Sequence, residues 1–334
     1  MTSPASVPGR TLGMGVDAAV EGRPSLAAPF GHALRALAHE DARVIGLTAD
    51  LGKYTDILPF AEAYPDRYFN VGMAEQNLIA VAAGLARTGK IPFVTTYGVF
   101  ATRRAYDFIA IACAHSAMPV KIFAGLPGLT TGYGGTHQAI EDLALMSAVP
   151  GLAVMDPCDA TELTAAVRLA AAHDGPIYVR LQRGNVPVVF DAASHALTLG
   201  RAIKLREGKD VGIVSTGLMT ERALDAATAL SGEGIAVGVL HVPFLKPFDE
   251  SAVVAFATST KRLVTAENHI ARGGLATRVV ESLYAAGIAR PLIRIGLPDR
   301  FIECGSTAYL QDKYGLATAR VTERIRTFVQ AGAT

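Results

Sequence analysis

One carboxylate stands at the start of a segment that is otherwise apolar and rich in alanine. Glu75 opens the stretch EQNLIAVAAGLAR, and two aromatic residues, Tyr97 and Phe100, follow in TTYGVF. The other side chain suited to chemistry is His137, in the glycine-rich stretch GYGGTHQ. Glutamate and histidine are common general acids and bases, although a first-turn glutamate can also serve only to interact with a helix dipole. Residue types and spacing alone indicate that these stretches could carry chemistry, but they do not identify a reaction.

The elements that must hold these residues alternate between strands and helices. Runs rich in β-branched residues are followed by Ala/Leu-rich segments with helical spacing, which is typical of parallel α/β architecture. Five buried strands are expected in the first half of the chain, at 43–50, 91–98, 119–125, 152–157 and 176–181. Chemistry in such folds usually lies on the loops at the carboxyl ends of the strands. The loops that carry Glu75 and His137 are of that kind.

The alternation breaks once, in the stretch VPVVFDAASHALTLGR. This break predicts a linker at 188–200 between two parallel-sheet α/β domains, one at 25–187 and the other at 201–334. Residues 1–24 are rich in Gly, Pro, Ser and Ala, and we expect them to form a loose leader.

Composition excludes several classes of partner. The 334 residues contain 31 Lys and Arg against 30 Asp and Glu, without a basic run, so neither nucleic acid nor an anionic membrane is expected to bind. The three cysteines have no CxxC spacing, which argues against a disulfide framework or a zinc site. The chain has no signal-like N-terminus and no apolar run of the roughly 18 residues that a membrane span needs. A cytoplasmic location is expected.

Several motifs in the chain resemble one enzyme family. The stretches TADL, FAEAYPDRYFNVGMAEQN, GGTHQAIEDLALM and YVRLQR are similar to the C-terminal half of transketolases, above all split transketolases whose halves are separate polypeptides. The resemblance continues through KPFDE, TAENHIARGGLATRV and LQDKYGL, and it covers nearly the whole chain after about Ser25. It implies a pyrimidine-binding domain followed by a transketolase C-terminal domain, and thiamin diphosphate with Mg²⁺ as cofactors.

The resemblance also implies roles for individual residues. Glu75 matches the acid that bonds N1′ of the cofactor's aminopyrimidine, where a carboxylate can share a proton and a glutamine cannot. Tyr97 and Phe100 match the aromatic residues around that ring, with core packing as the alternative, and Asp50 is expected to contact the cofactor. His137 matches the histidine that faces the cofactor's reactive carbon and the hydroxyls of the donor substrate.

The chain departs from the family pattern around the substrate. Transketolases usually read GEDG-x-THQ where this chain reads GYGGTHQ, so an aspartate is missing and Tyr133 lies in its neighbourhood. The usual phosphate-binding residues are replaced by Tyr54 or Thr55, by Leu126 and by Ala27. Only Arg183, in RLQRGN, remains to bind an anionic group. These differences predict an unusual sugar: deoxy, branched, sulfonated or non-phosphorylated.

Other residues of these motifs are expected to be structural or receive no role. Gln138 and Glu141 are expected to orient the loop and begin the next helix, and Glu267 and His269 to belong to a scaffold. No role is assigned to Arg103 or Arg104, which could serve a neighbouring chain or be solvated.

The family's diphosphate-binding motif is missing. Transketolases hold the diphosphate through Mg²⁺ with a GDG and a later Asn, and no GDG occurs in this chain. A separate N-terminal subunit is therefore expected to hold the diphosphate and most of the metal site, in an assembly with two copies of each chain and a dimer interface. The small sugar substrate would bind where the two subunits meet.

Three alternatives remain open. One is the β subunit of a 2-oxo acid dehydrogenase, and another is a decarboxylating carboligation like that of deoxyxylulose-phosphate synthase. The third is a catalytically silent assembly or regulatory subunit. Retention of both Glu75 and His137 argues against the third alternative, because a silent subunit needs neither.

Overall fold

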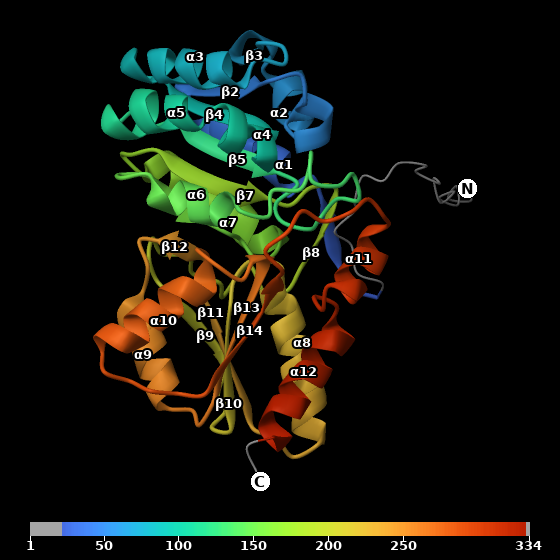
Figure 1. Cartoon of the computed structure of the whole chain (residues 1–334). Helices are drawn as coiled ribbons and strands as arrows, with labels where there is room; N and C mark the ends of the chain where they lie inside the picture. The colour runs from blue at the N-terminus through green and yellow to red at the C-terminus, as the bar shows by residue number, and fades with distance from the viewer. Residues whose placement is uncertain (1–21, 332–334) are drawn as a thin grey trace, which may run out of the picture.

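The computed structural model describes residues 22–331, in which two β-sheets lie one above the other, each covered by helices (Figure 1). The first sheet has seven strands in the order β12-β6-β7-β5-β4-β2-β3. Its strands are β2 (Val44–Thr48), β3 (Tyr68–Asn70), β4 (Ile91–Tyr97), β5 (Lys121–Gly125), β6 (Ala153–Met155), β7 (Ile177–Leu181) and β12 (Phe244–Lys246). All neighbours pair in parallel except β12 with β6.

Helices connect these strands. They are α1 (Pro29–Glu40), α2 (Leu58–Ala63), α3 (Glu75–Arg87), α4 (Gly98–Arg104), α5 (Tyr106–Phe108), a π-helical stretch (Ile109–His115), α6 (Asp142–Ala148) and α7 (Ala160–Ala172). Every residue of β2, β4, β5 and β7 is buried, as expected for central strands of a parallel sheet with covered faces.

The second sheet has five strands in the order β14-β13-β10-β11-β9. They are β9 (Ile203–Arg206), β10 (Val211–Ser215), β11 (Val237–His241), β13 (Leu263–Ile270) and β14 (Leu292–Leu297). Its helices are α8 (Met219–Gly232), α9 (Glu250–Thr258), α10 (Leu275–Ala285), α11 (Thr307–Lys313) and α12 (Thr318–Gln330). The predicted fold class, two α/β units with parallel-dominated sheets, is confirmed.

Two features of this fold differ from a simple pair of parallel sheets. Strand β9 runs antiparallel to β11, and β12, from the C-terminal half, pairs antiparallel with β6 and completes the first sheet. A short antiparallel pair, β1 (Ser25–Ala27) and β8 (Asn185–Pro187), joins the two ends of the first half. Residues 188–200 contain no helix or strand, and most of the predicted leader lies outside the described residues.

The two halves are joined by a fully buried arginine. The Nε atom of Arg180, on β7, donates to Oδ2 of Asp142 at 2.9 Å, and its Nη1 atom lies 3.2 Å from Oδ2 of Asp156. The same Nη1 donates to the carbonyl of Asn268, on β13 of the second sheet, at 3.1 Å. Burial raises the pKa of Asp156 to about 6. A buried arginine needs such a complete set of acceptors, because each unpaired buried charge is costly.

A second buried carboxylate connects three parts of the chain. Oε2 of Glu162, on α7, lies 2.9 Å from Nε2 of His241 on β11, and its Oε1 lies 3.3 Å from Nε2 of His195 in the 188–200 segment. Burial would raise the pKa of Glu162, but the positive field of His241 and the contact with His195 lower it to about 2. The His195 ring also stacks on Phe190, with ring centroids 4.4 Å apart.

Glu267 and His269, expected to be scaffold, both contact helix backbone. The Glu267 carboxylate accepts the N–H groups of Leu275 at 2.7 Å and Ala276 at 2.9 Å, the first residues of α10. Burial raises the pKa of this carboxyl to about 7. Nε2 of His269 accepts the N–H of Ala144 in α6 at 3.3 Å, so it bonds a helix of the first half.

Replacing Arg180 tests the role of the buried junction. We expect Arg180→Met to lower the free energy of unfolding by about 3–5 kcal/mol, because two buried carboxylates lose their cation. Chemical denaturation of the purified chain measures this. Arg168→Met is the matched control, since Arg168 pairs with Glu40 while both side chains are more than half exposed, and it should cost less than about 1 kcal/mol. Equal effects of the two changes would contradict this account.

Candidate active site

The predicted site residues come from the carboxyl ends of the central strands of the first sheet. Asp50 and Tyr54 follow β2, Tyr97 ends β4, His137 lies between β5 and α6, and Arg183 follows β7. Parallel strands bring these ends to one edge of the sheet.

The backbone at this edge is strained. Three non-glycine residues have left-handed conformations there, Asp50 with φ 60° and Asp56 with φ 55° after β2, and Leu126 with φ 54° after β5. Non-glycine residues rarely adopt this conformation, and such strain clusters at functional sites.

Glu75 is the first residue of α3 and is only 2 % exposed. Its Oε1 atom accepts a hydrogen bond at 2.9 Å from Nη1 of Arg104, at the end of α4. The Arg104 guanidinium also lies over the ring of Phe100, 4.1 Å from its centroid. One flat cation therefore contacts both the buried carboxylate and the aromatic face. Sequence reasoning missed Arg104, because two adjacent arginines in TRRAYD gave no signal for which one faces Glu75.

His137 lies among three aromatic rings. Its ring centroid is 6.1 Å from that of Tyr97, 5.5 Å from Phe100 and 5.4 Å from Tyr133. Its Nδ1 atom is 2.9 Å from the hydroxyl of Thr136. Burial and the positive charge of Arg104 lower the pKa of His137, which favours the neutral imidazole, a form with one nitrogen that accepts and one that donates.

Arg183, which forms no ion pair with a carboxylate within residues 22–331, lies beside this cluster. The Arg183 guanidinium carbon is 5.9 Å from the centroid of the Tyr54 ring, and its Nε atom is buried without a hydrogen-bond partner among the described residues. Burial raises the pKa of Tyr97, and the nearby Arg183 charge opposes that shift. This arrangement leaves a cation free to bind an anionic group.

The sequence left open whether Tyr54 or Thr55 replaces a usual phosphate-binding residue, and the two side chains differ in exposure and contacts. The Thr55 hydroxyl is buried, donates to the Leu51 carbonyl at 3.0 Å and lies 2.9 Å from the Thr95 hydroxyl oxygen. Tyr54, in contrast, is 45 % exposed and faces Arg183. Tyr54 is therefore the one that can contact a ligand.

Three other residues of the sequence analysis lie at the margin of the cluster. Asp50 is exposed, and its carboxylate accepts a hydrogen bond from the side chain of Asn70 at 3.2 Å. Leu126 is buried in an apolar cluster with Tyr97. Ala27 lies in β1, opposite Asn185 of β8.

Outside this region the described residues offer few other chemical centres. Between residues 22 and 331, no three His, Cys, Asp or Glu side chains are arranged to hold a metal ion. In the same range, no helix is both long enough and apolar enough to cross a membrane. The three cysteines are free thiols, with Cys113 and Cys158 buried and Cys304 exposed.

Comparison with known families agrees with this geometry. Residues 23–189 match the model of the transketolase pyrimidine-binding domain, and residues 200–321 match that of the transketolase C-terminal domain. The chain belongs to the transketolase family. Glu75 and His137 both lie within residues 23–189, the part of the chain that matches the pyrimidine-binding domain.

Three transketolase-family proteins illustrate its relatives. A putative uncharacterised transketolase family protein, y4mN of Sinorhizobium fredii, is 51 % identical over 91 % of this chain and 89 % of its own length. The 6-deoxy-6-sulfo-D-fructose transketolase subunit SqwH of a Clostridium species is 43 % identical over 86 % of this chain and 91 % of its own. A solved structure described as a split gene transketolase, inactive β4 tetramer, is 42 % identical, with a TM-score of 0.84 over 92 % of this chain and 99 % of that chain.

The charge of Arg104 should control the protonation of His137. We expect Arg104→Met to raise the pKa of His137, because removing a nearby positive charge favours the imidazolium form. An NMR titration of the imidazole carbons measures this pKa, with His137→Asn identifying the signal.

Arg87→Met is the matched control, because the substitution removes the same charge. Arg87 is exposed and lies at the other end of α3 from Glu75. A His137 pKa that stays the same in Arg104→Met, or that shifts equally in both variants, would contradict this assignment.

Proposed function

We propose that this chain is the C-terminal subunit of a thiamin-diphosphate-dependent transketolase, which moves a two-carbon ketol unit from a ketose to an aldehyde. The observation that carries the proposal is the arrangement of Glu75, Phe100 and His137 around one position. A buried carboxylate, an aromatic face and a neutral imidazole meet there, as an enzyme that binds a flat heterocycle and transfers protons beside it requires.

The residues of the site fit the pyrimidine end of the cofactor. The Arg104 guanidinium is flat, donates to Glu75 and stacks on Phe100, so it makes the two contacts that an aminopyrimidine would make. Because Arg104 is 49 % exposed at its side chain, it can turn outward toward solvent. Glu75, Phe100 and Tyr97 would then hold the ring.

Each residue has a distinct task in the proposed reaction. Thiamin diphosphate, when bound, supplies the carbon nucleophile that cleaves and forms the ketol bond. Glu75 is shielded from water and would hold the pyrimidine end of the cofactor by a hydrogen bond through which a proton can be shared. His137, whose pKa is lowered first of all by burial, accepts a proton from a substrate hydroxyl and returns it. Tyr97 and Phe100 limit the orientations available to the bound ring.

We propose further that the site is completed by a second polypeptide. The chain contains no GDG motif, so magnesium and the diphosphate would be held by an N-terminal subunit. The 42 % identical split gene transketolase is described as an inactive β4 tetramer, which supports a role for this type of chain as one of two kinds of subunit. Two copies of each chain would form the active assembly.

Isothermal titration tests the shared site. We expect tight binding of thiamin diphosphate with Mg²⁺ only when this chain is assembled with its partner, because the chain alone holds only the pyrimidine end. In that assembly, Glu75→Gln should lower kcat by at least about a hundredfold while the complex still forms, since an amide keeps the hydrogen bond but cannot exchange the proton.

Each contrary result has a definite meaning. Tight binding by the lone chain would place the diphosphate site within it and overturn the shared site. Unchanged turnover by Glu75→Gln would support a silent subunit instead of a catalytic one.

The substrate is proposed to be a sugar with one terminal anionic group that is not the usual phosphate. Arg183 is the cation available for such a group, and Tyr54 and Tyr133 stand where transketolases usually have other polar residues. A relative that is 43 % identical is described as a subunit acting on a 6-deoxy-6-sulfo sugar. A sulfonate presents three oxygens to an arginine as a phosphate does, but carries a single charge, which suits a site with one cation.

A panel of donors tests this specificity. We expect 6-deoxy-6-sulfofructose to react with a higher kcat/KM than xylulose 5-phosphate or fructose 6-phosphate. Arg183→Met should raise the KM for the sulfonated donor about tenfold to a hundredfold, because one charged hydrogen-bonding group is lost. A neutral ketose serves as the control donor and should be unaffected by the substitution. Preference for the pentose phosphate would overturn the substrate proposal, and preference for pyruvate would favour a decarboxylating enzyme.

A further inference from the structure

The loop that carries His137 has little structure of its own. Between β5, which ends at Gly125, and α6, which begins at Asp142, the chain forms no helix or strand, only an isolated bridge between Pro127 and Ala139 and a turn in which the N–H of His137 donates to the Gly134 carbonyl at 3.0 Å. The segment also includes four glycines, so its own backbone restricts its conformation weakly. Among residues 22–331, the side chain that hydrogen-bonds the imidazole is that of Thr136, in the same loop. The orientation of His137 therefore depends on what holds the loop.

Arg103, in the last turn of α4, bonds this loop on both sides of His137. Its Nη1 atom donates to the Gly135 carbonyl at 2.7 Å, and its Nη2 atom donates to the Gln138 carbonyl at 3.4 Å. Its Nε atom forms an ion pair with Glu141, the residue before α6. One planar group therefore fixes three points of the loop.

The C-terminal half supports the same arginine. The Arg103 guanidinium lies 5.4 Å from the centroid of the Phe301 ring, and that ring packs against Gly135 so closely that a Cβ there would be 3.1 Å from it. The N–H of Gly305 donates to the Gly132 carbonyl at 3.1 Å. Arg103 and the residue 301–305 segment together enclose the loop.

A second brace closes the loop internally. Gln138 is fully buried, and its Nε2 atom donates to the Thr131 carbonyl at 3.0 Å. This agrees with the expectation that Gln138 orients the loop. Gln138 and Thr131 belong to the loop themselves, however, so they cannot fix its position relative to α4, whereas Arg103 can.

We propose that Arg103 is a positioning residue that holds the backbone of the His137 loop and thereby aims the imidazole. Its consequence for catalysis rests on the proposed function of His137. The role is separate from that of Arg104, since the two adjacent arginines contact different groups, Arg103 the loop and Arg104 the Glu75 carboxylate. Arg103 and Glu141 are 30 % and 24 % exposed at their side chains, so their ion pair contributes little to global stability. The planar guanidinium of Arg103 instead restricts the conformation of the His137 loop, because its donors have fixed directions.

The test measures catalysis and loop opening in the same variants. In the assembled enzyme, Arg103→Met should lower kcat about tenfold to a hundredfold, because misplacing a catalytic group by an ångström has effects of that size. The KM for the donor and the affinity for thiamin diphosphate should change less than about threefold, since Arg103 touches neither Glu75 nor Arg183. Hydrogen–deuterium exchange of peptides covering 130–141 should become faster. Arg103→Lys, which can keep one of the three contacts, should recover part of both losses.

Arg67→Met is the matched control. Arg67 likewise donates to two backbone carbonyls, those of Asp41 at 3.2 Å and Ala38 at 2.9 Å, and stacks on the Tyr64 ring at 4.0 Å. These contacts lie before β2, at the opposite edge of the sheet from the site. This variant should leave kcat and the exchange of 130–141 unchanged.

A double variant separates positioning from general structural damage. If Arg103 acts through His137, adding Arg103→Met to His137→Asn should have almost no further effect on kcat. Fully additive losses would overturn the proposal, as would faster loop exchange without a loss of kcat, or unchanged exchange. If the wild-type assembly transfers no ketol unit from any donor, the proposed function fails. In that case the exchange measurement still decides whether Arg103 holds the loop.

Discussion

The buried Arg180 is the contact on which the arrangement of this molecule depends. It lies on the central strand β7, neutralises two carboxylates of the first half and reaches a carbonyl of β13 in the second. Because desolvated charges tolerate only a complete set of partners, this contact permits one relative placement of the two sheets. The segment 301–305 thereby reaches the loop of His137, so a residue of the C-terminal half helps to enclose a site built on the first sheet.

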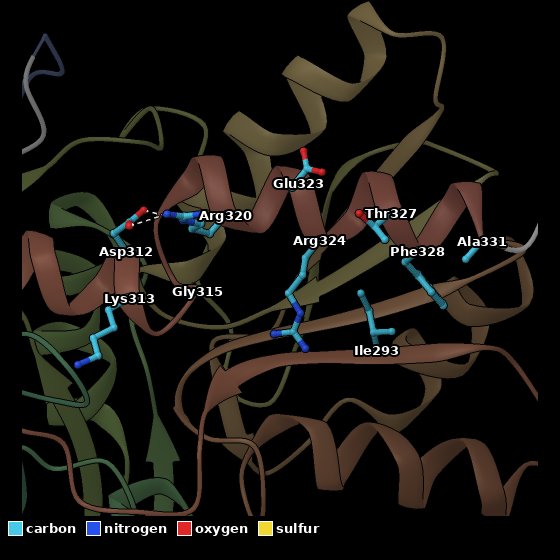
Figure 2. A pocket seen from close by; sticks show the side chains of 10 residues that line it. All are labelled: Ile293, Asp312, Lys313, Gly315, Arg320, Glu323, Arg324, Thr327, Phe328 and Ala331. Atoms are coloured by element: carbon cyan, nitrogen blue, oxygen red, sulfur yellow. Dashed lines mark hydrogen bonds and ion pairs between the residues drawn. The ribbon is translucent and has the colours of Figure 1, made fainter.

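Charge is distributed unevenly around the site, and this distribution shapes its chemistry. Arg104 and Arg183 both lie near the aromatic cluster, and the buried carboxylate of Glu75 pairs with the first of them. The charge of Arg104 adds to burial in lowering the pKa of His137. The C-terminal half contains a separate cavity of about 650 Å³ between β14 and α12 (Figure 2). In Figure 2, Arg320 is engaged with Asp312, and Arg324 extends toward β14 beside Ile293. This cavity shares no residue with the site.

The sequence predicted those features that depend on local patterns. Strand β4 is a run rich in β-branched and aromatic residues, and GGTHQ and AEQN are compact motifs, so the central sheet and the candidates Glu75 and His137 could be named before the structure was known. Strand β12 could not, because three residues paired to a strand some ninety positions earlier leave no periodic pattern. The contacts of Arg103 and Arg104 could not be predicted either, because they depend on the direction in which each side chain leaves the last turn of α4. The conformation of the 188–200 segment depends on contacts such as that of His195 with Glu162.

The pairing of β12 with β6 also limits how this chain can be divided. A fragment that ended in the 188–200 segment would retain every helix of the first half but would lose the strand that covers β6. The exposed backbone of β6 would then be an unpaired edge, which in isolated domains invites association with other chains. The boundary between the two halves of this chain is therefore crossed by a strand, and the first sheet has all seven of its strands only when the C-terminal half is present.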